Sequence, residues 1–380
     1  MSETGGSSSF PIESKADGAS WSLALEGMPQ FDVAMQRVYA WYANEIIDRA
    51  PVRFIAHNAQ FDNEPALGSR LSTAQLRERW FDAEYQVDQY IRSIAGKRFH
   101  GETFPVFYPN LGPDVYAAFY GTELTFHEVT SWSSPVVHNW EDMEGLALDM
   151  ENAYMAKLNE ITRCALEQCD GQFMVGYTDL HPGVDCAMAW RGSQQLCIDL
   201  ITEPEQVRAL IDLAIKDFER IYDHFDAVLK AANQLSVSWL GVPSFDKMHI
   251  PSCDFSAMIS PTFFADFCLP VMQREVAHAD QNVYHVDGPG VANHLDFILA
   301  EPRIQAIQWV QGQAEDRSIM QWVTLIERVQ TAGKSIIVDL QPHELDPFMA
   351  AVEPKGIYLW ISADDEEEQL RILERVKRWT

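Results

Sequence analysis

The stretch YHVDGPG, residues 284–290, indicates a buried strand that ends directly at the start of a helix. Its first residues are apolar and β-prone, and the Gly-Pro-Gly that follows interrupts any strand. Side chains two residues apart on a strand point to the same face, so His285 and Asp287 can converge on one metal ion or substrate. The alternative is a buried His285 that only hydrogen-bonds Asp287.

The segments on either side extend this unit into a repeating pattern. A helix pattern at 291–299 leads to the apolar strand 306–310, and the alternation of strand and helix is regular from about residue 172 onward. Such alternation predicts a parallel sheet, and seven or eight units predict a closed (β/α)8 TIM barrel with its chemistry at the carboxyl ends of the strands. The expected strands are 173–177, 237–240, 249–254, 304–310, 335–340 and 356–361.

The part before residue 170 is expected to be a helical extension of the barrel. Helix patterns cover 31–48, 72–94 and 140–169, and the long 204–235 helix belongs to the barrel itself. Residues 1–20 are polar and predict a disordered tail. We therefore expect one α/β domain over residues 21–380, with no linker in its middle.

Composition limits the partners. The 380 residues are 47% hydrophobic, enough for a large core, and carry a net charge of −28. This charge disfavours binding to nucleic acid or to an anionic membrane. The sequence has no apolar run of membrane-spanning length and no signal peptide at its start, and its six scattered cysteines suggest reduced thiols, so we expect a cytoplasmic protein.

Polar residues gather at the expected strand ends, where a barrel would turn them toward one mouth. We assign acid–base or catalytic roles to Asp179, His181, Asp254 and Asp287, although Asp254 could simply cap a helix. His285, Asp287 and Cys253 are the candidate metal ligands, with a core thiol as the alternative for Cys253. Candidate substrate contacts are Tyr177, Trp239, Gln308, Trp309, Asp339 and Arg191.

One motif is misleading. The string DLHPG, residues 179–183, begins like the Asp-x-His-x-x-Gly signature of corrinoid-binding domains, but Val184 stands where the glycine should be. We therefore expect no corrinoid bound in this chain. Glycine-rich nucleotide-binding motifs and the GxSxG nucleophile elbow are absent from the sequence.

Taken together, these strings resemble the uroporphyrinogen decarboxylase superfamily, which includes corrinoid methyltransferases. The similarity lies in YHVDGPG with HLDFILAEPRIQAIQWV (294–310), in DFSAMISPTFFADFCLPVM (254–272) and in IIVDLQPHEL (336–345), and extends over about 100–380. It implies a TIM barrel and, in the methyltransferases, a Zn²⁺ held by His, Cys and Cys. His285 matches the histidine, but Asp287 replaces the first cysteine and no cysteine stands near Ser362.

The resemblance thus implies harder ligands for any zinc, which favours Lewis-acid or water chemistry over thiolate transfer. The decarboxylases also carry an arginine-rich motif whose spacing Arg49, Arg53 and Arg70 do not reproduce. We expect a methyltransferase-like enzyme that demethylates a small compound with metal assistance, Zn²⁺ being the first candidate. The methyl acceptor would be external: a thiol, a folate or a separate corrinoid protein.

Two other functions remain open at this stage. The first is a decarboxylase or lyase for a small acid, in which Arg191 grips the carboxylate. The second is a catalytically inactive binding barrel, suggested by the missing cysteine ligands. The sequence also leaves a homodimer open.

Overall fold

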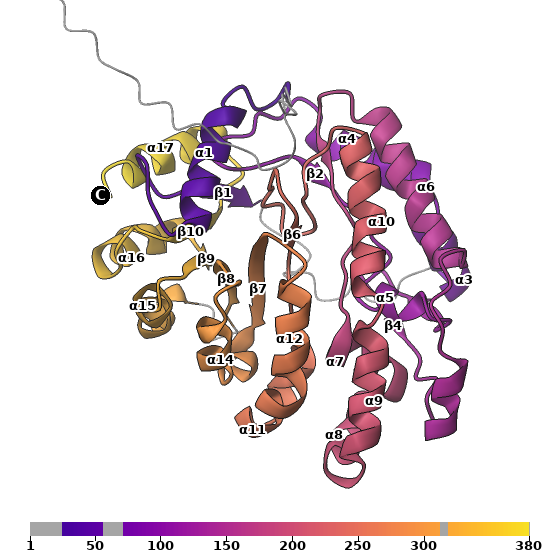
Figure 1. Cartoon of the computed structure of the whole chain (residues 1–380). Coiled ribbons are helices and arrows are strands. Elements are labelled where there is room, and N and C mark those ends of the chain that lie inside the picture. The colour runs from indigo at the N-terminus through magenta and orange to yellow at the C-terminus, as the bar shows by residue number, and fades with distance from the viewer. Residues whose placement is uncertain (1–24, 56–70, 312–317, 380) are drawn as a thin grey trace, which may run out of the picture.

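The computed structural model describes residues 25–55, 71–311 and 318–379, so the tail expected at 1–20 lies outside the described residues. Its centre is a six-stranded, wholly parallel sheet that curls so that helices cover its outer side (Figure 1). The strand order is β1 (Val52–Ile55), β10 (Ile357–Ser362), β9 (Ser335–Leu340), β8 (Ala306–Val310), β7 (Gln281–Asp287) and β6 (Met248–His249).

A second, shorter wall faces this sheet. Strand β2 (Val106–Phe107) pairs in parallel with β5 (Met174–Val175), and the Tyr177 amide donates to the Val237 carbonyl at 2.9 Å. On the other side, the Glu102 amide donates to the Val52 carbonyl of β1 at 2.7 Å. The parallel α/β architecture is therefore confirmed as a curled half-barrel consistent with a TIM-like barrel, but eight paired strands are not present among the described residues.

The helices follow the predicted alternation with several breaks. The barrel helices are α7 (Gly183–Arg191), α8 (Ser193–Thr202), α9 (Pro204–Ile215), α10 (Phe218–Ala231), α11 (Pro261–Phe263), α12 (Leu269–Val276), α13 (Gly288–Ala292), α14 (Leu295–Ala300), α15 (Val323–Thr331), α16 (Leu345–Ala351) and α17 (Glu366–Val376). The earlier part contains α1 (Phe31–Tyr42), α3 (Thr73–Trp80), α4 (Ala83–Ile94), α5 (Val115–Ala118), α6 (Ala153–Gln168) and the hairpin of β3 (Leu124–Phe126) and β4 (Ser131–Ser133).

Several sequence-based boundaries are wrong for local reasons. The helix predicted at 72–94 breaks where the Asp82 side chain accepts from the Tyr85 amide and starts α4. The strand predicted at 237–240 is reduced to an isolated antiparallel bridge between Ser236 and Ser244, because the chain turns back at Gly241 with a φ of +64°. Helix α7 was not predicted, since Pro182 before it and Gly183 at its start are typical of a loop.

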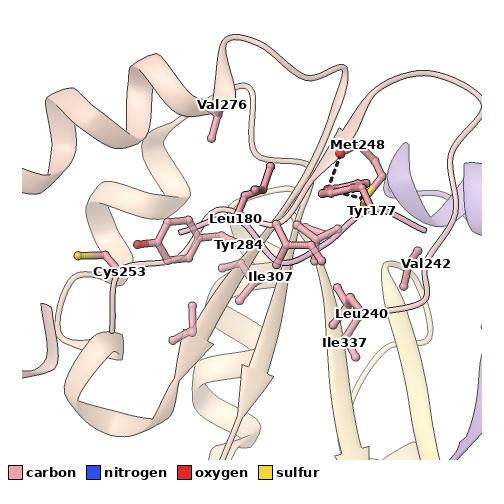
Figure 2. Packing of buried hydrophobic residues seen from close by; sticks show 14 of the residues in the cluster. Tyr177, Leu180, Leu240, Val242, Met248, Cys253, Val276, Tyr284, Ile307 and Ile337 are labelled. Carbon is pink, nitrogen blue, oxygen red and sulfur yellow. Dashed lines mark hydrogen bonds between the residues drawn. The ribbon is translucent and has the colours of Figure 1, made fainter. Parts of the chain in front are cut away.

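The core is continuous through the sheet. Ile337 of β9 faces the inside of the curl and Ile307 of β8 faces the helices, and the Tyr177 hydroxyl donates to the Met248 carbonyl at 2.8 Å (Figure 2). Apolar burial of this kind supplies the main favourable free energy of folding. Among the described residues, every helix is too short or too polar to span a bilayer.

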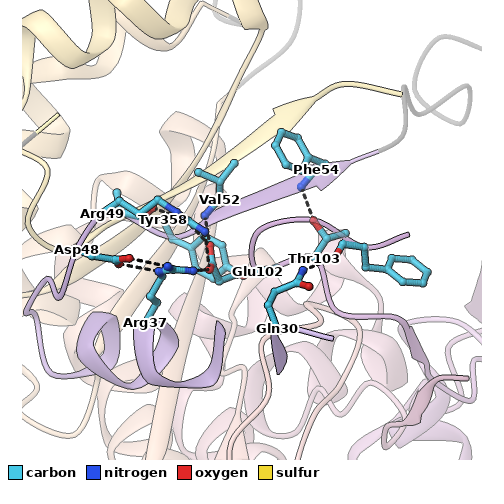
Figure 3. Close-up of polar contacts among 11 residues, drawn as sticks. Gln30, Arg37, Asp48, Arg49, Val52, Phe54, Glu102, Thr103 and Tyr358 are labelled. Carbon is cyan, nitrogen blue, oxygen red and sulfur yellow. Dashed lines mark hydrogen bonds and ion pairs between the residues drawn. The ribbon is translucent and has the colours of Figure 1, made fainter. Parts of the chain in front are cut away.

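A buried ion-pair network fixes β1 to the N-terminal segment. Glu102 is fully buried. Its carboxylate accepts hydrogen bonds from Nη1 and Nη2 of Arg49, at 2.8 and 2.9 Å, and from Nη1 of Arg37, at 3.0 Å (Figure 3). The same carboxylate accepts from the Val52 amide at 2.7 Å. Since β1 is short, this network rather than strand length anchors its amino end in the curled sheet.

Candidate metal centre at the carboxyl ends of the strands

The sheet register determines which side chains face the interior. His285 lies opposite Gln308 on the neighbouring strand, and Trp360 lies between Asp339 and Arg53 in the same way. Residues directly opposite each other in adjacent strands project to the same face. These five side chains therefore line the inner face at the carboxyl ends of β7, β8, β9, β10 and β1.

Two carboxylates and one imidazole lie close together at this mouth. One ligand atom each from Asp254, His285 and Asp287 lies within 4.8 Å of the other two. His285 and Asp287 share a face of β7, as the two-residue spacing predicts, and Asp254 comes from the short 3-10 helix η2 (Asp254–Met258) after β6. Two carboxylates and one imidazole form a hard ligand set suited to a divalent cation, with space for further ligands.

The Gly-Pro-Gly sequence explains how η2 comes so close to β7. Gly288 has a φ of +78°, which turns the chain sharply from Asp287 into α13. A Cβ atom at Gly290 would lie 2.8 Å from the Cβ of Ala257 in η2. The absence of a side chain at Gly290 therefore lets η2 pack directly on α13 and brings Asp254 next to the β7 residues.

Helix α7 holds η2 from the opposite side. The Asp185 carboxylate accepts from the Asp254 amide at 2.9 Å and from the Phe255 amide at 3.0 Å. The Nε2 atom of His294 lies 2.8 Å from the Ser256 carbonyl oxygen, and the His294 ring stacks on Phe264. The backbone of Asp254 is thus fixed by side chains that are themselves buried or partly buried.

The orientation of the His285 ring is set by its strand neighbour. Its Nδ1 lies 2.6 Å from Oε1 of Gln308, and an amide oxygen there accepts the Nδ1–H. In the form that binds a metal, that hydrogen bond leaves the lone pair on Nε2, the arrangement typical of a metal-ligating histidine. Trp239 meets the ring edge-to-face at 5.2 Å and limits its rotation.

The electrostatics of Asp254 reflect crowding by other carboxylates. Its side chain reaches solvent, yet the surrounding protein atoms desolvate it, and together with the Asp185 charge this raises its pKa to about 6. Positive charge on His285 or His181 acts in the opposite direction. A cation bound between Asp254 and Asp287 would relieve this repulsion.

A second polar group lies beside the triad. His181 Nε2 is 2.7 Å from Asp179 Oδ2, and its Nδ1 is 2.7 Å from the Ser252 hydroxyl. Burial lowers the pKa of His181, but the charge of Asp179 and its hydrogen bond more than offset this, so the pKa rises well above its usual value. The contacts with Asp179 and Ser252 therefore favour the protonated form of His181.

The structure places other predicted site residues elsewhere. The Cys253 thiol lies 3.7 Å from that of Cys268 and is not part of the triad, while Trp309 points to the outer face and packs on Trp322 at 4.8 Å. Tyr177 is buried and bonded to Met248. Arg191 forms an ion pair with Asp199 at 2.6 Å, so the alternative lyase hypothesis loses its carboxylate-binding residue.

Sequence reasoning did not identify Arg53 or Asp185. Arg53 stands on the strand β1, which the hydrophobic pattern did not reveal, because only four residues form it. Asp185 lies 69 residues before Asp254, and only the fold brings its carboxylate to that amide. No sequence pattern indicated Asp185, because helix α7, which carries it, was not predicted.

Comparison with known proteins supports the fold. No protein-family model matches the chain, and no curated protein matches its sequence. Among solved structures, a methyltransferase from Methanosarcina mazei is similar over 91% of this chain and 98% of its own, with a TM-score of 0.57 and 12% sequence identity. The chain thus has a methyltransferase-like fold, and at this identity the likeness concerns architecture alone.

Proposed function

We propose that this protein is a methyltransferase-like enzyme of the uroporphyrinogen decarboxylase superfamily. It would take a methyl group from a small O-, N- or S-methyl compound at the mouth of the curled sheet, with a divalent cation held by Asp254, His285 and Asp287. The methyl acceptor would be an external thiol, folate or corrinoid protein. In the transfer, the bond between the donor heteroatom and the methyl carbon breaks, its electron pair stays on the heteroatom, and the acceptor forms the new bond.

The hydrogen bond between His285 and Gln308 is the observation that carries the proposal. It favours the tautomer whose Nε2 carries a lone pair, and one ring nitrogen of His285 lies within 4.8 Å of two carboxylate oxygens, so the donors fit a divalent cation. A cation bound there would act as a Lewis acid that stabilises negative charge on an oxygen or sulfur ligand during the transfer. The methyltransferase-like fold supports the reaction class as an analogy.

His181 is our candidate for proton transfer. Its contact with Asp179 raises its pKa and favours the protonated form, and Ser252 is only two residues before Asp254. A leaving oxygen or nitrogen that needs a proton could receive it from this pair through the Ser252 hydroxyl. Asp254 and Asp287 would meanwhile hold the cation.

The test uses deuterium-labelled methyl groups. Purified protein with added Zn²⁺ would be incubated with trideuteromethyl ethers, amines and thioethers, with mercaptoethanol or cob(I)alamin as acceptor, and the acceptor would be examined by mass spectrometry. We expect labelled acceptor with the wild type and with His343→Ala, whose histidine is exposed and outside the triad, and none with His285→Ala. Carbon dioxide release without methyl transfer would instead identify a carboxy-lyase.

A further inference from the structure

Arg53 is a guanidinium at the mouth that lacks a carboxylate partner. It is half-buried, with its Cζ 4.4 Å above the Trp360 ring and Nη1 donating to the Leu240 carbonyl. Desolvation lowers its pKa, and the Asp339 charge only partly offsets this. No described carboxylate forms an ion pair with it, in contrast to Arg37, Arg49 and Arg191.

The stacked geometry leaves the binding edge of the guanidinium available. Stacking on Trp360 uses the flat face, whereas the N–H donors lie in the plane, where a carboxylate can receive two of them. One donor is bonded to Leu240. Gly241 lies so close that a Cβ atom there would be 2.9 Å from Nη1, so the loop after Ser238 is shaped around this side chain.

Asp339 is an unpartnered acid on the same inner face. Its Oδ1 is buried and has no hydrogen-bond partner among the described residues, and burial raises the pKa of the carboxyl to about 7 although Arg53 counteracts it. Asp339 on β9 and Arg53 on β1 are each the direct strand neighbour of Trp360, which lies between them on β10. Their Cα atoms are therefore roughly 10 Å apart, two strand spacings, with the Trp360 side chain between them.

This pair is continuous with the candidate metal centre. Arg53 touches the loop at Leu240 and Gly241, and the preceding residue, Trp239, contacts His285 at 5.2 Å. The indole N–H groups of Trp239 and Trp360 are both buried and have no hydrogen-bond partner among the described residues. A half-buried guanidinium without a described ion-pair partner, a half-buried carboxyl and two buried N–H donors at one mouth together favour a ligand that carries both charges.

We propose that the methyl donor is a small zwitterion, an N-methylated amino acid whose carboxylate binds Arg53 and whose ammonium group lies against Asp339, beside the metal centre. This rests on the proposed function, which it deepens by naming the class of donor. The carboxylate supplies the anion that Arg53 lacks, and the ammonium charge allows Asp339 to ionise.

Calorimetric titration of the metal-loaded protein with matched probes tests this. Glycine betaine, dimethylglycine and sarcosine carry both charges, choline lacks the carboxylate, and methoxyacetate lacks the ammonium group. We expect at least one zwitterion to bind at least about tenfold more tightly than choline and methoxyacetate, because each of these leaves one buried group unpaired. Equal binding of all probes, or binding of none, would overturn the proposal.

Two variants locate the site. Arg53→Gln and Asp339→Asn should each weaken zwitterion binding at least about tenfold, whereas Arg220→Gln, an exposed arginine, should leave it unchanged. If Arg53→Gln does not fold, Asp339→Asn decides alone, and unaltered affinity there refutes the assignment. If zwitterions bind but no methyl group is transferred, only the proposed function is contradicted. If a neutral ether donates its methyl group but zwitterions do not bind, only this inference is contradicted.

Discussion

Gln308 shows how a residue expected to touch substrate can instead orient a ligand. Its side chain accepts from His285 Nδ1 at 2.6 Å and is 5% exposed, so little of it remains for a substrate. The pairing of His285 with Gln308 depends on strand register, which the sequence does not reveal. The convergence of His285 and Asp287 could be predicted, because it depends only on the two-residue period of one strand.

Replacing this amide tests its role directly. In Gln308→Ala the His285 ring loses the partner that fixes its tautomer, and the affinity for Zn²⁺ should fall about 10–100-fold. Competition with a chelating dye would measure it. Gln330→Ala, which removes an exposed amide remote from the mouth, is the control and should bind Zn²⁺ like the wild type. Equal affinities in both variants would refute the orienting role.

Asp339 should make stability depend on pH with a definite sign. Burial raises its folded-state pKa to about 7 from 3.8, so between those pH values the unfolded chain loses a proton that the folded chain retains. The free energy of unfolding therefore falls as pH rises through this window. Below the window the carboxyl is protonated in both states and adds no pH dependence. Asp339→Asn should be more stable than wild type at pH 8, by about 2–4 kcal/mol, and nearly equal at pH 4.

Urea denaturation at pH 4, 5.5, 7 and 8 would measure this difference. Asp212→Asn, on the exposed face of α9, serves as the control and should show no pH-dependent change relative to wild type. If Asp339→Asn were less stable than wild type at pH 8, the surroundings of Asp339 would stabilise its ionised form rather than destabilise it, contrary to this prediction.

At the scale of elements, the contact between η2 and α13 creates the candidate site. The alternation of strands and helices could be read from hydrophobic periodicity, but the position of η2 could not, because it depends on contacts with Asp185, His294 and Gly290. Cys253 illustrates the same limit. It precedes Asp254 in the chain, yet the backbone turns its thiol to Cys268 on the far side.

Gly290→Ala should displace η2. The added Cβ would lie 2.8 Å from the Ala257 Cβ, and such overpacking costs about 1–3 kcal/mol, more than the helix propensity that alanine gains. We expect a lower melting temperature and weaker Zn²⁺ binding. Gly145→Ala, at a position with nothing within 4 Å, should change neither, and a normal Gly290→Ala protein would show that η2 has room to shift.

For the molecule as a whole, the N-terminal segment completes the mouth through charges rather than through a long strand. The sequence predicted a helical extension there, and α1, α3, α4 and α6 are present, but the four-residue β1 and its buried network around Glu102 were not foreseen. Pairing between Arg49 and Glu102, 53 residues apart, follows from tertiary structure alone. Through β1 it positions Arg53 at the mouth.

Glu102→Gln should therefore weaken the whole fold. Removing one partner leaves the Arg49 charge buried without compensation, which typically costs 3–5 kcal/mol, roughly. Asp48→Asn, which removes the exposed partner of Arg37, should cost less than about 1 kcal/mol. Urea unfolding at neutral pH would compare them. Similar small losses in both variants would mean that the buried network contributes little to stability.

The central claim is that Asp254, His285 and Asp287 bind a divalent cation. Elemental mass spectrometry of protein purified without chelators, for wild type beside His285→Ala and His343→Ala, tests it most directly. The account predicts close to one equivalent of metal in wild type and in His343→Ala, and a large loss in His285→Ala. Metal-free wild type that also fails to take up added Zn²⁺, or equal metal in all three proteins, would contradict it.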